Sequence, residues 1–442
     1  MPEQSIQSLR IALLTHSVNP RGGVVHTLEL ANALHDCGHQ VTVLAPARPG
    51  QALFRTPRCA VELVPLDEAD GAAAVDVVQM IASRRSAYVK HLSHLLRTQT
   101  FDVLHAQDGI GGNALADLCD AGAIGSFVRT VHHLDTFADA RVMAWQTRAF
   151  LRARQVLCVS QTWCDTLRRE HGIEAALVHN GVDLTRFTRS SQTQPLLPLP
   201  LPQEEGALHA TAGTDAQVAA RHGLRPGAPM FLAVGGIEER KNTLRLLEAF
   251  IAFHAEQPAA QLAIVGGASL LDHHAHTASF HAILSTNGLR SGPFEPVVVT
   301  GTVPDADMPA LFRAADALLM PSVREGFGMV VLEALASGTP VVVSRIAPFT
   351  EYLGADEAES HCCWADPQSA ASITEAMRRA LDPAHAQALA QRTPAVCERF
   401  SWHASAARHE QLYRAHVALA ARERSDQAAA EPAHQPAFQT AH

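Results

Sequence analysis

Two glutamates stand eight residues apart around a Gly-Phe-Gly turn, within VREGFGMVVLEALASGTPVV at residues 323–342. They are Glu325 and Glu333. A glutamate in such a place can cap a helix, bind a metal or hold a polyhydroxylated ligand. A metal pair is disfavoured, because no His or Asp stands nearby with ligand spacing. A carboxylate accepts hydrogen bonds from two adjacent hydroxyl groups, so a ribose or a sugar ring is the chemically apt ligand.

The segment around this pair predicts a strand, a turn and a helix. The apolar run at 317–322 reads as a strand, and a helix is expected from about Met329 to Ser337, where a glycine ends it. Glu325 then lies in the loop at the carboxyl end of the strand, and Glu333 lies about one turn inside the helix. Backbone N–H groups at 327–329 would hold a phosphate.

Two other strand ends carry glycine-containing loops that run into helical patterns, at 15–34 and 233–250. Ligands of open α/β sheets bind at the carboxyl ends of strands, where helix N-termini offer N–H groups to phosphates. Gly22 and Gly23 would let the backbone approach a diphosphate closely, although tight turns alone also explain them. Neither loop has the G-x-G-x-x-G spacing of a dinucleotide fingerprint, which disfavours an NAD-dependent oxidoreductase.

Short apolar runs separated by helix-length segments recur along both halves of the chain. Continuous rather than alternating apolar strands indicate parallel sheets that helices cover on both faces. The runs fall at 11–16, 41–46, 102–107, 127–132 and 155–160, and then at 230–236, 261–267, 297–301, 317–322 and 341–345. Two such series predict an α/β protein with two doubly wound, Rossmann-like domains.

Length and composition suggest where the domains begin and end. At 442 residues the chain is too long for one ordinary core. Rossmann-like domains are expected at 1–187 and 218–398, joined by a linker or insertion at 188–217 that is rich in Pro, Ser and Thr. An amphipathic helix is expected at 399–422, and the low-complexity tail at 423–442 is expected to be disordered.

Composition also argues against several classes of function. A formal net charge of −9 and the lack of a dense Lys/Arg block disfavour a nucleic-acid partner. No apolar run approaches the ~20 residues of a membrane-spanning helix, and the N-terminus reads as a strand rather than a signal peptide. Eight scattered cysteines without a C-x-x-C pair indicate reduced thiols. A cytoplasmic location is therefore expected, with peripheral membrane contact left open.

Several motifs together resemble those of the retaining family 4 glycosyltransferases, and the similarity covers most of the chain. REGFGMVVLEALASGTPVV is similar to the E-x7-E signature of that family. THSVNPRGGVVHTLELA and VVVSRIAPFTEYLG resemble, more narrowly, a bacterial subgroup. Further segments resemble family stretches in the family's order: the Gly-Gly loop at 22–23, VHNGVDLTRF at 178–187, the stretch 299–322 and RFSWHASAARHEQLYR at 399–414.

The resemblance implies the GT-B fold, in which two Rossmann-like domains face each other across a cleft. The N-terminal domain would bind the acceptor, the C-terminal domain would bind the nucleotide sugar, and the helix at 399–422 would cross back to the N-terminal domain. The implied reaction moves a sugar from a nucleotide-diphosphate sugar to a hydroxyl acceptor with retention, without a metal or further cofactor. The histidine-rich stretch at 271–281 could bind a metal, but family 4 enzymes do not generally use one, so it is expected to be a polar surface loop.

The resemblance also implies roles for single residues around the two glutamates. Glu333 would bind the ribose of the donor, and Glu325 would bind the transferred sugar. Val303 would lie against the base, and the loop at 22–23 would contact the donor phosphates. Backbone contacts to the diphosphate and the sugar would come from Phe327, Gly328 and Met329.

Two further residues match catalytic positions of the family, and one position departs from it. Lys241 matches the lysine that meets the developing charge on the leaving diphosphate, and such a cation stabilises the transition state. His132, in TVHHLDTF, matches the histidine near the reacting sugar, with His133 as the competing assignment. The family usually has an arginine where this chain has Gly236, so Arg240 is expected to reach the phosphates instead.

Two alternative functions stay open on the sequence. One is another GT-B-like enzyme, such as a sugar-nucleotide epimerase or a phosphorylase. The other is a non-catalytic protein that binds a nucleotide sugar without turnover. Intact Glu325, Glu333 and Lys241 argue against a degenerate site, whereas Gly236 at the arginine position leaves room for one.

Overall fold

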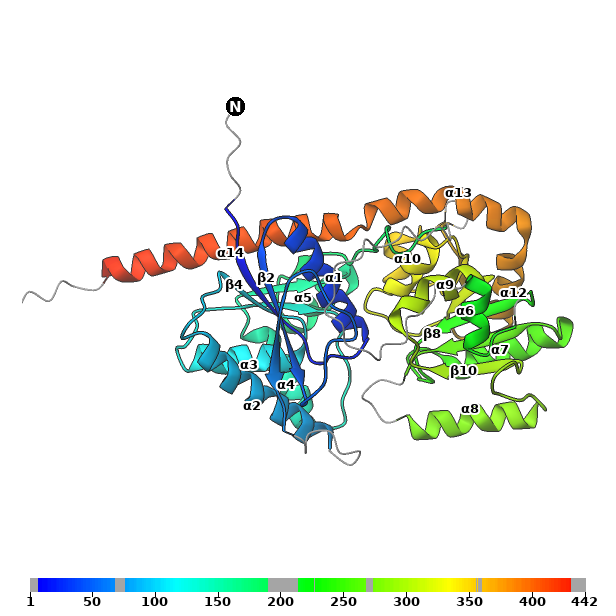
Figure 1. Cartoon of the computed structure of the whole chain (residues 1–442). Helices are drawn as coiled ribbons and strands as arrows, with labels where there is room; N and C mark the ends of the chain where they lie inside the picture. Colours follow the sequence, from blue (N-terminus) through cyan, green and yellow to red (C-terminus); the bar gives the residue numbers. More distant parts are fainter. Residues whose placement is uncertain are drawn as a thin grey trace, which may run out of the picture. The chain divides into compact units, whose positions relative to one another are not determined.

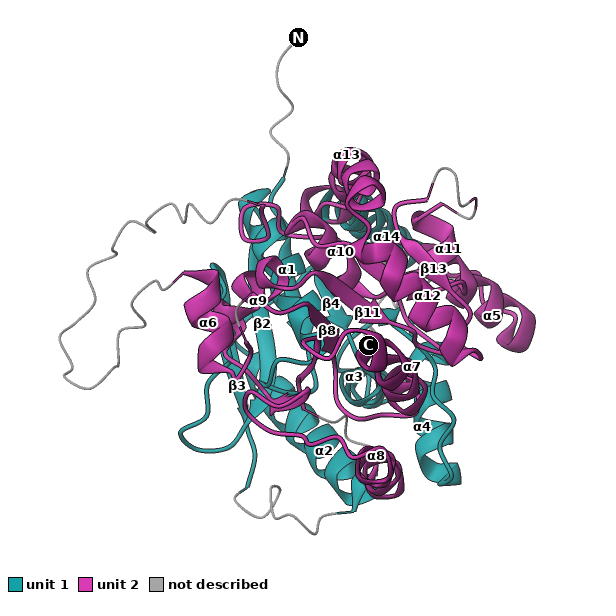
Figure 2. Cartoon of the chain, turned by 90° about the vertical axis from the view of Figure 1, so that its right-hand side faces the viewer, with its two compact units in different colours: residues 1–157, 406–442 teal, residues 158–405 magenta. Residues whose placement is uncertain are grey.

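The chain forms two compact units in the computed structural model. Unit 1 comprises residues 1–157 and 406–442, and unit 2 comprises residues 158–405. Figure 2 shows the two units in different colours. The structure describes residues 7–67, 76–189, 214–225, 227–267, 273–354, 356 and 360–430.

The first sheet has the strand order β3-β2-β1-β4-β5-β6-β7. Its strands β1 to β5, of which Figure 1 labels β2 and β4, lie in unit 1, whereas β7 falls among the residues of unit 2. Strand β1 pairs in parallel with both β2 and β4. The strands are β1 Arg10–Leu14, β2 Gln40–Ala47, β3 Ala60–Pro65, β4 Val103–Ala106, β5 Val128–Val131, β6 Gln155–Cys158 and β7 Ala176–Leu177. The helices of unit 1 that connect them are α1 Gly22–Asp36, α2 Val77–Leu95, α3 Gly109–Asp120 and α4 Ala140–Leu151.

The second sheet lies in unit 2 and has the strand order β10-β9-β8-β11-β12-β13. Its strands are β8 Met230–Val234, β9 Gln261–Val265, β10 Val297–Gly301, β11 Ala317–Met320, β12 Val341–Ser344 and β13 Cys363–Ala365. The helices of this part are α5 Gln161–His171, α6 Asp215–Arg221, α7 Thr243–Glu256, α8 His274–Thr286, α9 Met308–Ala314, α10 Met329–Ala336, α11 Phe349–Tyr352, α12 Ala370–Leu381 and α13 Pro383–Arg399. A short 3-10 helix, Asp305–Asp307, precedes α9.

Side chains along the second sheet alternate between two separate hydrophobic cores. Leu232 packs into one core, whereas its neighbours Phe231 and Ala233 pack into the other. In β11, Leu318 packs into the first core and Leu319 packs into the second. Because both faces are buried, both alternating sets of residues must be apolar, which explains the continuous apolar runs. The prediction of two α/β domains with parallel sheets is confirmed.

Three strands do not appear among the predicted runs: β3, β7 and β13. All three end the strand order of a sheet, where one side has no neighbouring strand. In β3, Val61 and Leu63 are each 38% exposed, so this strand lacks the continuous burial that marks the central ones. β7 and β13 are only two and three residues long, so neither forms an apolar run that a sequence pattern can reveal.

Three predicted irregular segments contain helix instead. The tail at 423–442 is helical at its start, because α14 (Trp402–Ala430) continues through an alanine run of high helix propensity. Thr214 and Gln217 form a capping box that starts α6 within the predicted linker. The histidine-rich stretch is helical from His274, where α8 begins. Residues 190–213 and 431–442 of the predicted linker and tail lie outside the described residues.

The unit boundaries differ from the expected domain boundaries at two places. Residues 158–187, expected in the N-terminal domain, group with unit 2. Within that unit, the Val182 N–H donates to the Phe400 carbonyl at 2.9 Å. From Ala406 onward α14 groups with unit 1, where the Tyr413 hydroxyl lies 2.6 Å from His105 Nδ1. In the part of the chain that the structure describes, no helix is both long and apolar enough to cross a membrane.

Candidate functional site

The strand order of unit 2 reverses between β8 and β11, which are neighbours in the sheet. The loops that follow these two strands therefore leave the carboxyl edge side by side, at the place where open α/β sheets bind ligands. The Val323 N–H donates to the Arg240 carbonyl at 3.0 Å. Asn242 Nδ2 donates to the Pro321 carbonyl at 2.9 Å. These bonds hold together the loop at 235–242 after β8, which we call the lysine loop, and the loop at 321–328 after β11, which we call the glutamate loop.

The Glu325 carboxylate is the centre of a buried polar cluster between these loops. Its Oε1 atom lies 2.7 Å from Lys241 Nζ and 3.0 Å from Arg240 Nη1. Ser322 Oγ donates to the same oxygen at 3.0 Å. Glu325 is only 7% exposed. A carboxylate at this depth is costly unless it is paired, and here two cations and a hydroxyl group compensate it.

Burial and pairing act in opposite directions on both members of the ion pair. Burial raises the pKa of Glu325, but the charges of Lys241 and Arg240 and the hydrogen bonds from Lys241 and Ser322 together outweigh it, so the pKa is lowered. Burial lowers the pKa of Lys241, and the nearby Glu325 carboxylate opposes this only in part. The Glu325 carboxylate is therefore ionised at neutral pH.

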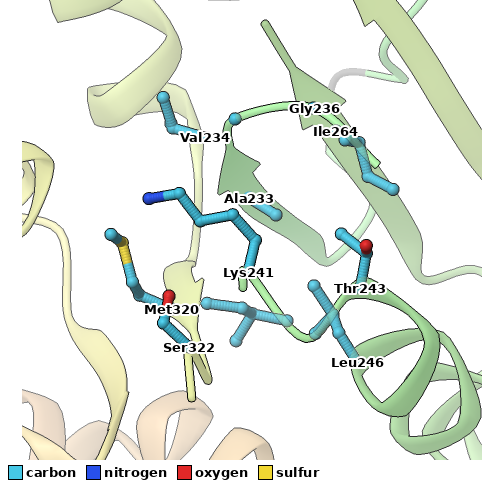
Figure 3. Close-up of a pocket in the computed structure, with 11 residues that line it drawn as sticks. Ala233, Val234, Gly236, Lys241, Thr243, Leu246, Ile264, Met320 and Ser322 are labelled. Carbon is cyan, nitrogen blue, oxygen red and sulfur yellow. The ribbon is translucent and has the colours of Figure 1, made fainter. Parts of the chain in front are cut away.

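A small pocket opens beside this cluster, and Lys241 lies in its wall (Figure 3). Gly235 has φ +133°, a value that L side chains rarely adopt, and a Cβ there would lie 3.2 Å from Lys241 Cε. Gly236, at the position where an arginine was expected, also lines the pocket, so no side chain occupies that part of the wall. The remaining lining residues include Val234, Thr243, Leu246, Met320 and Ser322.

Helix α10 starts at the same edge, directly after the glutamate loop. Its N-cap is Gly328 with φ +86°, and no side chain caps the helix. The Tyr352 hydroxyl donates to the Phe327 carbonyl at 3.0 Å, and the two rings stack with centroids 4.8 Å apart. The predicted strand-turn-helix arrangement is confirmed: Glu325 lies in the loop and Glu333 lies half-buried in the helix.

The predicted residues of unit 2 thus converge only in part. Lys241, Arg240 and Glu325 are in direct contact. Phe327 and Val303 are almost fully buried in the same hydrophobic core, with 3% and 8% exposure. Met329 is partly buried against that core. The sequence did not point to Ser322, Asn242 or Tyr352, whose contacts with the site depend on loops that only the fold brings together.

The predicted residues of unit 1 gather at the carboxyl edge of the first sheet. Gly22 and Gly23 open α1, and a Cβ at Gly23 would lie 3.9 Å from the His16 ring. His132 follows β5, and its Nε2 lies 3.3 Å from Gln107 Oε1, which follows β4. The ring of His132 makes an edge contact with the buried His26 ring, with centroids 4.6 Å apart.

The two candidate histidines occupy different environments. Burial, together with the neighbouring His26 and Arg129, lowers the pKa of His132 well below its usual range. His133 is 43% exposed and lies 2.9 Å from Asp135 Oδ2. His132 is thus an enclosed imidazole that is neutral at pH 7, whereas the side chain of His133 is exposed.

One histidine of α8, His276, contacts the residue that begins α7, directly after the lysine loop. His276 Nε2 lies 3.1 Å from the Thr243 hydroxyl, and that hydroxyl also bonds to the backbone of Glu238. Within the described ranges, no three His, Cys, Asp or Glu side chains are arranged to hold a metal ion.

Two family models match separate parts of the chain. Residues 20–186 match the family model described as Glycosyltransferase Family 4. Residues 216–395 match the model described as Glycosyl transferases group 1. A D-inositol 3-phosphate glycosyltransferase from Segniliparus rotundus is 31% identical over 196 residues, which cover 44% of this chain and 41% of the relative. The matches span about half or less of the length of the curated relatives, from 24% to 51%.

Solved structures agree over a larger part of the chain at lower identity. Sucrose-phosphate synthase from Thermosynechococcus elongatus superimposes with a TM-score of 0.71 at 20% identity, covering 93% of this chain and 100% of the other. Anabaena HepE, solved in complex with UDP and glucose, superimposes with a TM-score of 0.67 at 16% identity. The match covers 91% of this chain and 99% of the other. These likenesses show the GT-B glycosyltransferase fold. The chain belongs to the glycosyltransferases, with a Glycosyltransferase Family 4 domain followed by a group 1 domain.

Proposed function

We propose that this protein transfers a sugar from a nucleotide-diphosphate sugar to a hydroxyl acceptor, with retention of configuration and without a metal. The observation that carries the proposal is the Lys241–Glu325–Arg240 cluster at the point where the strand order of unit 2 reverses. This cluster offers an ionised carboxylate to a polyol and positive charge to a phosphate. HepE, whose fold this chain shares, was solved with UDP and glucose. A cytoplasmic location belongs to the same proposal.

Glu325 would position the transferred sugar. The three hydrogen bonds from Lys241, Arg240 and Ser322 converge on Oε1. The other carboxylate oxygen can then accept hydrogen bonds from sugar hydroxyl groups. Because the surrounding contacts hold the carboxylate before the donor arrives, little reorganisation is needed on binding.

Lys241 and the start of α10 would stabilise the leaving diphosphate. As the bond between the anomeric carbon and the phosphate oxygen breaks, negative charge grows on the diphosphate, and a preorganised cation stabilises it. Backbone N–H groups at Gly328 and Met329 favour an anion at the helix N-terminus. Arg240 would supply further charge in place of the arginine that Gly236 replaces, and Glu333 would bind the ribose.

The acceptor hydroxyl would attack from the face that the diphosphate leaves, and a leaving-group oxygen would accept its proton. This gives retention without a protein base. The neutral His132 of unit 1 would donate or accept a hydrogen bond to the reacting sugar, and the Gly22–Gly23 loop would approach the donor phosphates.

Calorimetric titration with UDP, GDP and ADP, each followed by a sugar conjugate and with EDTA present, tests the donor site. We expect one nucleotide to bind with micromolar affinity and Glu333→Ala to abolish that binding. Glu375→Ala, which changes a side chain that is 60% exposed on α12, serves as the matched control. Loss of binding in EDTA would contradict metal independence.

The chemistry is tested by incubating the donor that binds with a panel of hydroxyl acceptors. Transfer with a retained anomeric configuration, read from the proton NMR coupling of the product, would support the proposal. Conversion of the donor without an acceptor would indicate an epimerase, and a requirement for inorganic phosphate would indicate a phosphorylase. Binding without any turnover would indicate a non-catalytic nucleotide-sugar protein.

A further inference from the structure

Helix α5 reaches the backbone of the glutamate loop through one buried tryptophan. Trp163 lies in the first turn of α5, and its Nε1–H donates to the Glu325 carbonyl at 3.3 Å. The side chain is only 7% exposed. The two residues are 162 positions apart in the chain, and both belong to unit 2. The bond therefore holds the main chain of Glu325, whereas Lys241, Arg240 and Ser322 hold its carboxylate.

The N-terminus of α5 is capped by a carboxylate from another helix. Ser160 stands at the N-cap position but its side chain makes no capping bond. Instead, Glu351 of α11 accepts hydrogen bonds from the backbone N–H groups of Gln161 at 2.8 Å and Thr162 at 2.9 Å. It also accepts a hydrogen bond from the Thr162 hydroxyl at 2.5 Å. An acidic group at a helix N-terminus accepts hydrogen bonds from backbone N–H groups that have no partner within the helix, and it interacts favourably with the helix dipole. Glu351 therefore fixes the turn that carries Trp163.

The same short helix holds the other side of the glutamate loop. Tyr352, next to Glu351, donates to the Phe327 carbonyl at 3.0 Å. Phe349 lies so close to Gly328 that a Cβ there would be 2.5 Å from its ring. The carbonyls on either side of Gly326 are thus both held, one by α5 and one by α11.

We propose that Trp163 is a positioning residue for Glu325, and that Glu351 acts on the same carboxylate through α5. This inference rests on the proposed function. A site must be held within about 0.5 Å of its productive geometry, and a carboxylate that is fixed only at its tip can still shift with its main chain. Trp163 supplies that second point of attachment. The nucleotide would be bound by Glu333, the helix N-terminus and the two cations, and the one side-chain hydrogen bond of Trp163 in the described part of the chain goes to the Glu325 carbonyl rather than to any of these groups.

The decisive variant is Trp163→Phe, which keeps an aromatic ring and removes the N–H donor. Trp364→Phe is the matched control, because Trp364 is 3% exposed in unit 2 and its Nε1 has no hydrogen-bond partner among the described residues. UDP, GDP and ADP are titrated into each protein, together with UDP-glucose, GDP-mannose and ADP-glucose. The nucleotide and conjugate that the wild type binds most tightly are then compared across the variants.

We expect Trp163→Phe to leave the nucleotide Kd unchanged and to raise the ratio of conjugate Kd to nucleotide Kd about tenfold, because the displaced Glu325 carboxylate would lose one charged hydrogen bond to the sugar. Trp364→Phe should keep the wild-type ratio. General loss of stability would weaken both ligands together, so the ratio separates positioning from folding. An unchanged ratio in Trp163→Phe would overturn the inference and leave the proposed function standing.

Glu351→Gln provides a second variant if Trp163→Phe fails to fold. We expect it to raise the same ratio, while Glu174→Gln, which alters a side chain that is 73% exposed beyond the other end of α5, should not. A wild-type ratio in Glu351→Gln would exclude its action through α5. Failure of the wild type to bind any of the six compounds would overturn the proposed function itself.

Discussion

Lys241 Nζ lies 2.7 Å from Glu325 Oε1, although 84 positions of the chain separate the two residues. The pair forms because β8 and β11 are neighbours in the second sheet and because each residue lies in the loop after its strand. Each partner is enclosed, with Glu325 7% and Lys241 16% exposed at the side chain. A pair at this depth affects both the stability of unit 2 and the charge that a ligand meets.

Removal of the lysine should slow the proposed transfer more than it weakens donor binding. Lys241→Ala should cost about 2–4 kcal/mol of transition-state stabilisation, by analogy with the loss of one oxyanion-hole donor. Initial rates with the donor identified by titration measure this as a fall in kcat/KM. Lys90→Ala, at an exposed position of α2, is the control. Turnover equal to that of the wild type would remove Lys241 from the mechanism.

Removal of the carboxylate should reveal the coupling between the two charges. Glu325→Gln leaves Lys241 and Arg240 without their shared anion, and breaking a buried ion pair costs about 3–5 kcal/mol. The double variant Lys241→Ala/Glu325→Gln should lose less than the sum of the two single variants, because one unpaired cation is absent. Free energies of unfolding in urea for the four proteins give the coupling energy. Strict additivity would show that the pair contributes no interaction energy.

Gly328 should tolerate alanine less well than another glycine with the same backbone conformation. Gly328 and Gly338 have φ of +86° and +87°, so each alanine incurs a cost of about 1–2 kcal/mol. A Cβ at 328 would lie 2.5 Å from the fully buried Phe349 ring, whereas at 338 it would meet the Arg189 side chain at 2.8 Å. Gly328→Ala should therefore lose a further ~1–3 kcal/mol through overpacking. Equal urea midpoints for the two variants would contradict the close approach of Phe349.

The protein should lose stability as the pH falls below about 6.5. Burial is the main cause that lowers the pKa of His105 and His132 well below the ordinary 6.5, and burial with Arg154 lowers that of His416 to about 4. Each histidine is thus neutral when folded but takes up a proton when unfolded. The unfolded state binds more protons in this window, so stability rises with pH there, by up to about 1.4 kcal/mol per pH unit for each group.

The contribution of one histidine can be isolated by substitution. His416→Gln removes the group that titrates between about 4 and 6.5, so the fall of Tm between pH 6.5 and pH 4.5 should become shallower. His403→Gln, at an exposed position of α14, should keep the wild-type slope. Parallel Tm curves for His416→Gln and the wild type would show that His416 is not linked to folding.

Local sequence patterns were sufficient for most of the secondary structure around the site. The apolar run at 317–322, the Gly-Phe-Gly turn and the terminal glycine placed Glu325 in a loop and Glu333 in a helix, as α10 confirms. These signals are local, because strand burial, glycine conformation and helix capping act over a few residues. The sequence did not predict strand β3 or the starts of α6 and α8. Their local patterns are short or mix polar with apolar residues.

The contacts of Glu325 were decided by the tertiary structure alone. The continuous apolar strands and the glycine loops determined that the chain forms two parallel α/β sheets with ligand loops at their carboxyl edges. No local pattern indicates that β8 lies beside β11. Nor does any local pattern indicate that Arg240 and Lys241 both pair with the Glu325 carboxylate, or that Trp163 donates to the Glu325 carbonyl. Strand order and helix docking depend on burying apolar faces across long separations, so only the folded chain sets the partners of a buried charge.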